Sequence, residues 1–299
     1  FEKTIYIPNN MKKLILAIAF ILVSLASYAD EVQDYINEFT KAVAELIPGE
    51  GHTEVSIDLR KAHSPDFSIL GVREIAPIDD GTFFTQFSLF NTEMPNGKPG
   101  GDERIIGNLG FGVRKLAQDN TILYGINSFY DIDFENEHQR GSLGVEVRSA
   151  VLAFHFNKYQ RISDDYNEEN VLNGWDYQLS SQIPYLHWAS AFINEYRWDG
   201  VLRDDVRGKK MGSEMLLTPN LNMEIAYDDK DTSGLDDEWY SKLQFFHPPR
   251  ESGPTALDGI SDTAWKENKD MSGELLSKVK RQNKIMIEFK GLSTISRTD

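Results

Sequence analysis

The residue types present limit the chemistry that this chain could perform. Its 299 residues include no cysteine, which excludes disulfides, thiolate metal sites and cysteine nucleophiles. The six histidines are scattered, and the pair that we single out as a possible hydrolase site is His138 with Asp133. No nucleophile-elbow, zinc-protease, Walker or dinucleotide-binding motif accompanies this pair. Hydrolysis is therefore an alternative only, and we expect neither enzyme activity nor a cofactor.

The acidic loop DDKDTSGLDDE, residues 228–238, offers a possible calcium site. Asp229, Asp231, Ser233 and Gly234 have the spacing of the first ligands and the glycine of an EF-hand loop. Tyr240, however, occupies the position of the bidentate glutamate that such a loop needs. A solvated acidic loop is the simpler interpretation, and we expect no metal.

Charge is distributed unevenly along the chain. The formal net charge of −16 argues against binding to nucleic acid. Residues 271–291 nevertheless carry +3, from five cations and two glutamates, which leaves −19 for the rest of the chain. A basic strand inside an acidic pore would be favoured electrostatically where water is partly excluded. The alternative is an amphipathic surface helix with a solvated basic face.

The beginning of the chain predicts secretion. After Met11, two lysines precede an apolar run over residues 14–26, and small residues occupy positions 27 and 29. This pattern predicts a signal peptide at 11–29, because an apolar run of 13 residues is too short to span about 30 Å of hydrocarbon. Residues 1–10 precede the start methionine and look like read-through of upstream sequence. A retained anchor is the alternative.

The mature chain is expected to begin with one helix and to continue in strands. Apolar residues at three- and four-residue spacing predict an amphipathic helix within a segment at 30–49 that ends at Pro48 and Gly49. Beyond it, apolar and polar residues alternate, as in a strand whose two faces differ. The predicted strands are 53–60, 66–75, 82–90, 104–116, 121–131, 138–148, 151–160, 173–182, 186–198, 209–217, 220–228 and 237–247. The second and the tenth alternate poorly.

The connections between these strands indicate what their apolar faces contact. Connections after odd-numbered strands are long and polar, whereas those after even-numbered strands are tight turns. An even strand count, strands of about ten residues and this asymmetry are typical of an outer-membrane barrel. The expected fold is therefore all-β, a twelve-stranded antiparallel transmembrane β-barrel. A secreted sandwich whose apolar faces pack on each other is the structural alternative.

In such a barrel, polar faces line the lumen and aromatic residues near strand ends meet the lipid headgroups. The expected lumen residues are Glu54, Asp58, Asn108, Arg114, Asn127, Asp131, Glu146, Arg148, Asp176 and Glu224. The expected aromatic belt consists of Trp175, Tyr177, Trp188, Tyr196, Trp198 and Trp239.

Several motifs in this order resemble one family. They include ERIIGNLGFGVRKL, with an N-x-G-x-G-x-R strand at 108–114, and LYGINSFYDIDF, with a G-x-N-x-F-x-D strand at 125–131. A GWD sequence at 174–176 follows. Over residues 50–248 the chain resembles the β-domain of the intimin and invasin family, the inverse autotransporters. The resemblance implies a twelve-stranded outer-membrane barrel, short turns in the periplasm and long loops outside the cell.

The resemblance also implies a role for the segments after the barrel. In that family the chain turns back, threads the lumen and leads an adhesive passenger to the cell surface. Here residues 249–270 would be a linker, and 271–299 would supply a short helix and an extended segment, with 284–291 covering about 26 Å of the pore at 3.3 Å per residue. The residues expected to plug the pore are Lys278, Lys280, Arg281, Asn283, Lys284 and Ile285.

The resemblance implies partners as well. These are outer-membrane lipid, the barrel-assembly machinery, with WYSKLQFF at 239–246 as the insertion signal, and a receptor reached through a passenger. The sequence departs from the family in ending at Asp299 before any folded passenger; either the passenger has been truncated or the barrel carries a very short tail. The alternative function is a small solute channel of the outer membrane that the C-terminal segment gates.

Overall fold

The computed structural model describes residues 37–60, 65–94, 102–163, 168–232, 236–250, 253–266 and 270–289. The signal peptide expected at 11–29 and the residues before it lie outside this part. Of the predicted N-terminal helix, residues 37–45 are described and are helical. Among the described residues, no helix is long and apolar enough to cross a membrane.

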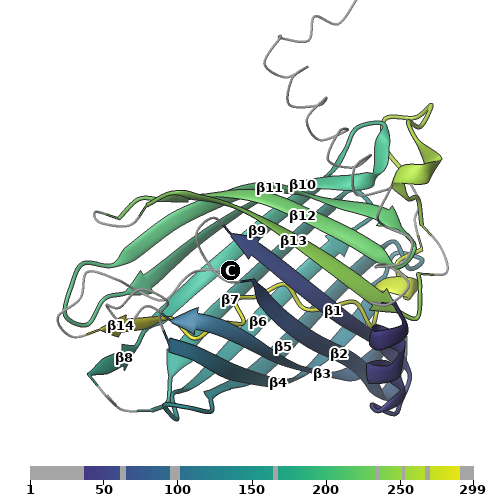
Figure 1. Ribbon diagram of the computed structural model, residues 1–299. Coiled ribbons are helices and arrows are strands. Elements are labelled where there is room, and N and C mark those ends of the chain that lie inside the picture. The colour runs from purple at the N-terminus through teal and green to yellow at the C-terminus, as the bar shows by residue number, and fades with distance from the viewer. Residues whose placement is uncertain are drawn as a thin grey trace, which may run out of the picture.

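Twelve strands of the described chain close into one antiparallel barrel, in which β1 pairs with β13 (Figure 1). The strands are β1 (Gly51–Arg60), β2 (Asp66–Ile78), β3 (Gly81–Met94), β4 (Asp102–Ala117), β5 (Ile122–Asp133), β6 (Gln139–Ser149), β7 (Leu152–Arg161), β9 (Asn173–Ile183), β10 (Leu186–Asp199), β11 (Val206–Thr218), β12 (Leu221–Lys230) and β13 (Glu238–His247). Sequential strands are neighbours throughout, apart from the interposed β8. The predicted twelve-stranded barrel is thus confirmed.

Two short strands that the sequence did not predict form a separate sheet. β8 (Glu169–Val171) lies in the connection between β7 and β9, and it pairs antiparallel with β14 (Ile287–Phe289). In Figure 1 this sheet lies at the end of the barrel where the long connections are, which we call the loop end. The tight turns, such as 118–121 between β4 and β5, lie at the other end, which we call the turn end.

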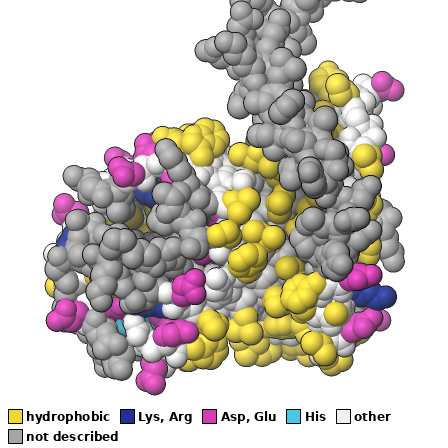
Figure 2. Space-filling view, in the orientation of Figure 1, with side chains coloured by type: hydrophobic (Ala, Val, Ile, Leu, Met, Phe, Trp, Pro, Cys, Tyr) yellow, Lys and Arg dark blue, Asp and Glu magenta, His cyan; other side chains and the backbone are white. Residues whose placement is uncertain are grey.

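The barrel wall is apolar outside and polar inside. On the outer face, Leu109, Phe111 and Leu143 are exposed, Leu143 by 67%. Asn108 and Glu146, which alternate with such residues, are buried. Figure 2 shows hydrophobic side chains over the middle of the visible face and acidic side chains toward its ends. This distribution suits a barrel surrounded by lipid, because in a soluble protein the charged face would be outside.

Both strands that alternate poorly carry an irregularity in their pairing near the turn end. The register between β2 and β3 shifts at Glu74/Ala76, and that between β11 and β12 shifts at Leu216/Thr218. A bulge inserts an extra residue into one strand, so the side chains beyond it exchange faces. The shifts disturb the alternation only over the last residues of each strand. Within β2 the alternation is weak because Leu70 and Val72, on the inner face, are apolar and pack in one buried cluster with Val279.

Two residues predicted for the aromatic belt lie inside the barrel instead. Tyr196 and Trp198 are 2% and 1% exposed, and Trp198 packs on the ring of Tyr159 with centroids 5.1 Å apart. Tyr196 pairs across the sheet with Asp176, so it shares the inner face with that carboxylate. Their assignment to the belt was wrong because it rested on their position near a strand end and ignored the face of β10 that they occupy.

The other four belt residues take different positions. Trp239 is 62% exposed on β13. Trp175 and Tyr177 stack with ring centroids 6.1 Å apart. Trp188 donates a hydrogen bond from Nε1 to the carbonyl oxygen of Gly259, 2.8 Å away. Contact of these four rings with headgroups stays a prediction.

The buried Trp198 generates a stability prediction at Gly174, its cross-strand neighbour. A Cβ added at Gly174 would lie 2.2 Å from Cε3 of Trp198 and 2.5 Å from the carbonyl oxygen of Arg197. Gly174→Ala should therefore lower the free energy of unfolding by about 1–3 kcal/mol, as overpacking does. Urea unfolding in detergent measures this change. Gly273→Ala is the control, because no atom lies within 4 Å of its added Cβ; equal stability of both variants would contradict the prediction.

Candidate functional site: the threaded lumen

The C-terminal part of the described chain runs through the barrel from the turn end to the loop end (Figure 1). Its entry is fixed at the β4–β5 turn, where the amide of Met271 donates to the carbonyl oxygen of Asn120 over 2.8 Å. A single 3-10 turn, η2 (Ser272–Glu274), follows, and the described part of the chain reaches β14 at the far side. We call residues 270–289 the threaded segment. The helix expected here is thus only this turn.

The crossing is made by residues nearer the N-terminus than predicted. Residues 284–291 were expected to span the pore, but Ile287 already belongs to β14 at the loop end. Residues 275–286 make the passage instead. The prediction was wrong because it placed the whole crossing after Lys284, whereas the only helical turn of the segment ends at Glu274 and leaves the residues after it free to cross.

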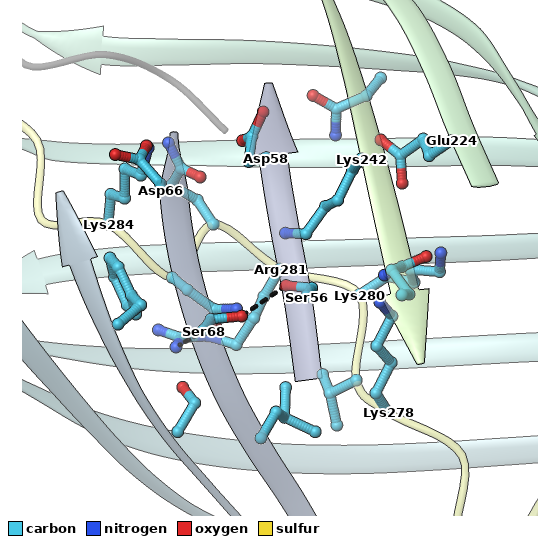
Figure 3. Close-up of a pocket in the computed structure, with 18 of the residues that line it drawn as sticks. Ser56, Asp58, Asp66, Ser68, Glu224, Lys242, Lys278, Lys280, Arg281 and Lys284 are labelled. Atoms are coloured by element: carbon cyan, nitrogen blue, oxygen red, sulfur yellow. Dashed lines mark hydrogen bonds and ion pairs between the residues drawn. The ribbon is translucent and has the colours of Figure 1, made fainter. Parts of the chain in front are cut away.

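Each of the four cations in residues 270–289 lies within ion-pair distance of a carboxylate of the wall. Figure 3 labels these four cations and one of the carboxylates, Asp66. Lys278 lies 3.0 Å from Glu54 on β1, and Lys284 lies 2.6 Å from Asp66 on β2. Lys280 pairs with Glu214 on β11. Arg281 donates from both terminal nitrogens to Asp131 on β5, at 3.0 and 2.7 Å. The segment is therefore held from several sides of the barrel.

Asp131 is the most heavily engaged of these carboxylates. Besides Arg281, it accepts a hydrogen bond from Nε of Arg140 at 2.9 Å and one from Asn108 at 2.7 Å. The guanidinium of Arg281 also lies over the ring of Phe129, 4.2 Å from its centroid. Asp131, Arg140 and Arg281 have fully buried side chains, so one carboxylate serves as the shared counter-ion of two cations away from water.

A second set of contacts holds the main chain of the threaded segment rather than its side chains. Arg114 donates to the carbonyl oxygen of Leu275 at 2.9 Å, and Arg140 donates to that of Gln282 at 2.7 Å. Asn157 and Asn108 donate to the carbonyl oxygens of Lys280 and Asn283 at 3.0 and 3.1 Å. Gln86 accepts from the amide of Val279 at 2.8 Å, and the Tyr159 hydroxyl accepts from that of Gln282 at 2.7 Å. The contacts to carbonyl oxygens are open to every residue type, and those from the two amides to every type except proline.

All ten residues predicted to line the lumen have side chains on the inner face. Eight are buried, and Arg148 and Glu224 are partly exposed. Arg148 binds Glu274 of the threaded segment at 2.7 Å, and Glu224 accepts from the Tyr240 hydroxyl at the same distance. Of the predicted plug residues, Asn283 accepts from Arg281 at 3.1 Å. Ile285 packs with Ile106, Phe90 and Val171 in a buried apolar cluster at the loop end.

Sequence reasoning missed two of the four wall carboxylates, Asp66 and Glu214. Asp66 is the first residue of β2, one of the two strands with poor alternation. Glu214 lies opposite Glu224 in the β11–β12 pair, so the same-face rule applied to Glu224 could have found it.

The possible hydrolase pair is not a pair in the structure. Nε2 of His138 lies 2.7 Å from Glu169 of β8, whereas Asp133 binds Arg104 at 3.1 Å. Arg104 also donates two hydrogen bonds to the carboxylate of Glu169, at 2.6 and 2.8 Å. His138 and Asp133 are both fully buried. We call His138, Arg104, Glu169 and Asp133 the exit cluster, because it fixes β8 against the wall beside the emerging β14.

The possible calcium loop receives no support from the described residues. No group of three or more histidine or acidic residues in them could hold a metal ion. Tyr240 points into the lumen toward Glu224. Ser233 and Gly234 lie outside the described residues.

Free space remains in the lumen on one side of the threaded segment. A cavity of about 120 Å³ lies between the segment and the wall formed by β1, β2 and β10–β13 (Figure 3). Its lining includes Asp58, Glu224 and Lys242 of the wall and Lys278 and Lys280 of the segment. The contacts to main-chain carbonyls come mostly from the opposite wall, so the segment lies against one side of the barrel.

The exit cluster should respond to acid. Burial raises the pKa of Glu169, but hydrogen bonds from His138 and Arg104 outweigh this effect and lower the pKa to about 2. The stability that the ionised Glu169 contributes is therefore complete above the unfolded-state value of 4.5 and is lost as pH falls toward about 2. Amide exchange of β8 and β14, corrected for intrinsic rates, should lose protection over this interval.

Glu169→Gln is the control for this prediction. Its neutral amide should leave β8 less protected at neutral pH and remove that part of the acid dependence. The same acid dependence in this variant and in the original chain would contradict a role for Glu169.

Comparisons with known proteins agree with this architecture. The family described as "Inverse autotransporter, beta-domain" matches residues 22–283. The "Putative attaching and effacing protein homolog" of Escherichia coli (strain K12) is 26% identical over 242 residues, covering 72% of this chain and 78% of the relative. The "Inverse autotransporter adhesin YeeJ" of the same strain is 26% identical over 238 residues, covering 74% of this chain but only 10% of the adhesin.

A solved structure shares the fold. It is described as "Unveiling the Mechanism Behind the in-meso Crystallization of Membrane Proteins", and it superposes with a TM-score of 0.59 at 19% identity, covering 80% of this chain and 100% of that one. At this identity the likeness concerns the fold alone. The family match over most of the chain, together with the twelve-stranded barrel, shows that this chain belongs to the inverse autotransporter β-domain family of outer-membrane barrels.

Proposed function

We propose that this barrel anchors in the bacterial outer membrane and carries its own C-terminal segment through its lumen to the cell surface. The observation that supports this proposal most directly is the path of the threaded segment, which enters at the β4–β5 turn and emerges beside β8. In the proposed orientation the tight turns face the periplasm and the long connections face outward. The chain would thus deliver whatever follows β14 to the outside.

The contacts along the lumen support a plug that remains in place after passage. A charge moved from water into a protein interior costs several kcal/mol unless an opposite charge and hydrogen bonds compensate it. Withdrawal of the segment would leave Asp131 with one cation, Arg140, in place of two. It would also remove the lysines of the segment that pair with Glu54, Asp66 and Glu214. The charges of the wall therefore favour the threaded arrangement.

Adhesion is the proposed role of the displayed part. A matched relative is named as an adhesin, and this chain spans a tenth of its length. The surface-binding activity would belong to a passenger connected to the threaded segment, and the receptor would be recognised there. Lipid would surround the barrel, and the barrel-assembly machinery would insert it, with residues 239–246 in the last strand as the insertion signal.

A second candidate function, a small solute channel, has one observation in its favour. The cavity beside the threaded segment, about 120 Å³, has a polar and charged lining. Such a lumen could pass small hydrophilic solutes once the segment moves aside. Conductance separates the two candidates.

Display can be tested with an epitope tag appended after Asp299. If the threaded segment leads outward, an antibody should bind this tag on intact cells. The same tag inserted in the β4–β5 turn should be reached only after the outer membrane is permeabilised. A C-terminal tag that likewise needs permeabilisation would contradict the export of this segment.

Plugging can be tested by conductance in planar bilayers. The intact chain should be nearly closed, and deletion of 271–299 should open it. Asp131→Asn should raise the open probability, because it removes the charge that Arg281 and Arg140 share. Asp204→Asn, an exposed loop residue, is the control with the same charge change. An intact chain that conducts as strongly as the deletion would contradict the plug and favour the channel.

A further inference from the structure

The segment that joins the last barrel strand to the threaded segment lies outside the barrel wall. Residues 253–266 contain one 3-10 turn, η1 (Ala256–Asp258), which contacts the outer side of β10 and β11. In Figure 1 this turn projects beyond the ring of strands at the turn end, beside the β9–β10 hairpin. We call residues 253–266 the outer flap. Neither the lumen contacts nor the exit cluster involves it.

The outer flap is held against the β9–β10 hairpin by hydrogen bonds. The amide of Tyr185 donates to the carbonyl oxygen of Ala264 at 2.9 Å, and the amide of Ser261 donates back to Tyr185 at 2.8 Å. Further bonds join Trp188 Nε1 to the Gly259 carbonyl oxygen, His187 to that of Thr263, and the Lys266 amide to the Gln182 side chain, at 2.8, 2.9 and 3.0 Å. The flap is thus a defined part of the barrel surface.

η1 itself is closed by a capping box. The carboxylate of Asp258 accepts from the amide of Thr255 at 2.6 Å and from its hydroxyl at 3.1 Å. Gly259 then takes a φ of 68°, in the left-handed region that glycine enters without strain. These local bonds fix the direction in which the side chains between them project.

Despite this fixed backbone, the flap directs large apolar side chains outward. Leu257 is 82% exposed and Ile260 is 78% exposed. Trp265 of the flap and Tyr185 of the hairpin are exposed aromatic neighbours. Scattered apolar residues are common on surfaces, but a hydrogen-bonded turn that displays two aliphatic side chains beside two aromatic rings indicates a binding surface.

The position of the flap favours lipid as the occupant. The flap contacts β10 and β11. Farther along the outer wall, Leu179 of β9 and Met211 of β11 are exposed apolar residues. The flap lies at the turn end, where a barrel wall passes from hydrocarbon to headgroups, and tryptophan and tyrosine favour that depth. We propose that the outer flap is a lipid-binding element that inserts Leu257 and Ile260 into the membrane leaflet on the turn side. It would set the depth at which this side of the barrel sits.

The absence of cysteine allows a direct test, because one introduced cysteine gives one labelled site. Leu257→Cys, Ile260→Cys and, as the control, Ser272→Cys would each carry an environment-sensitive fluorophore. Ser272 is exposed in η2 at the lumen mouth, at the same end of the barrel. The intact chain would be reconstituted into phosphatidylcholine vesicles with and without bromine on the upper acyl carbons, and iodide would serve as the aqueous quencher.

The labels at 257 and 260 should be quenched by brominated lipid at least about twofold more strongly than the label at 272, as expected for side chains below the headgroups. Iodide should quench them less than it quenches the control. Weak quenching by lipid with full access to iodide would overturn the proposal by placing the flap in water. Protection from both quenchers would also overturn it, because a second protein surface, such as another copy of this chain, would then cover the flap.

Discussion

The structure depends on the neutralisation of charges that the barrel removes from water. Asp131 lies between Arg140 and Arg281, and all three side chains are fully buried. An ionised group in such a place is tolerated only when an opposite charge and hydrogen bonds compensate its lost hydration. A single carboxylate faces two cations here. The rings of Phe129 and Tyr159, which lie beneath the guanidinium groups of Arg281 and Arg140, add cation–π attraction that stabilises the second positive charge. The threaded segment and the wall therefore require each other.

This mutual requirement follows from the inside-out wall. Lipid accepts only the apolar side of each strand, so polar and charged side chains are directed to the lumen. A lumen lined only by such groups would contain many partly hydrated charges. The threaded segment supplies cations to the carboxylates of the wall and carbonyl oxygens to its arginines and asparagines. It thereby replaces water with fixed partners across the full height of the barrel.

Much of this architecture could be predicted from the sequence, because strand alternation and connection length are local properties. Those two features predicted the strand number and which residues, such as Glu54 and Glu146, face inward. Pairing across the lumen could not be predicted, since Lys284 and Asp66 are far apart in the chain and meet only through the closure of the barrel. The interior position of Tyr196 and Trp198 was not predicted, because these residues were assigned by their closeness to the end of the strand and not by the face of the strand on which they lie. The outer flap left no periodic pattern to detect.

The many lateral bonds of the threaded segment determine how a mechanical load would enter the barrel. A pull on the emerging end acts along the chain, whereas its ion pairs and carbonyl contacts run sideways into β1, β2, β5 and β11. Such bonds are strained together in shear instead of being peeled apart one after another. Tension would consequently be shared by several strands and passed to the surrounding bilayer through the whole cylinder.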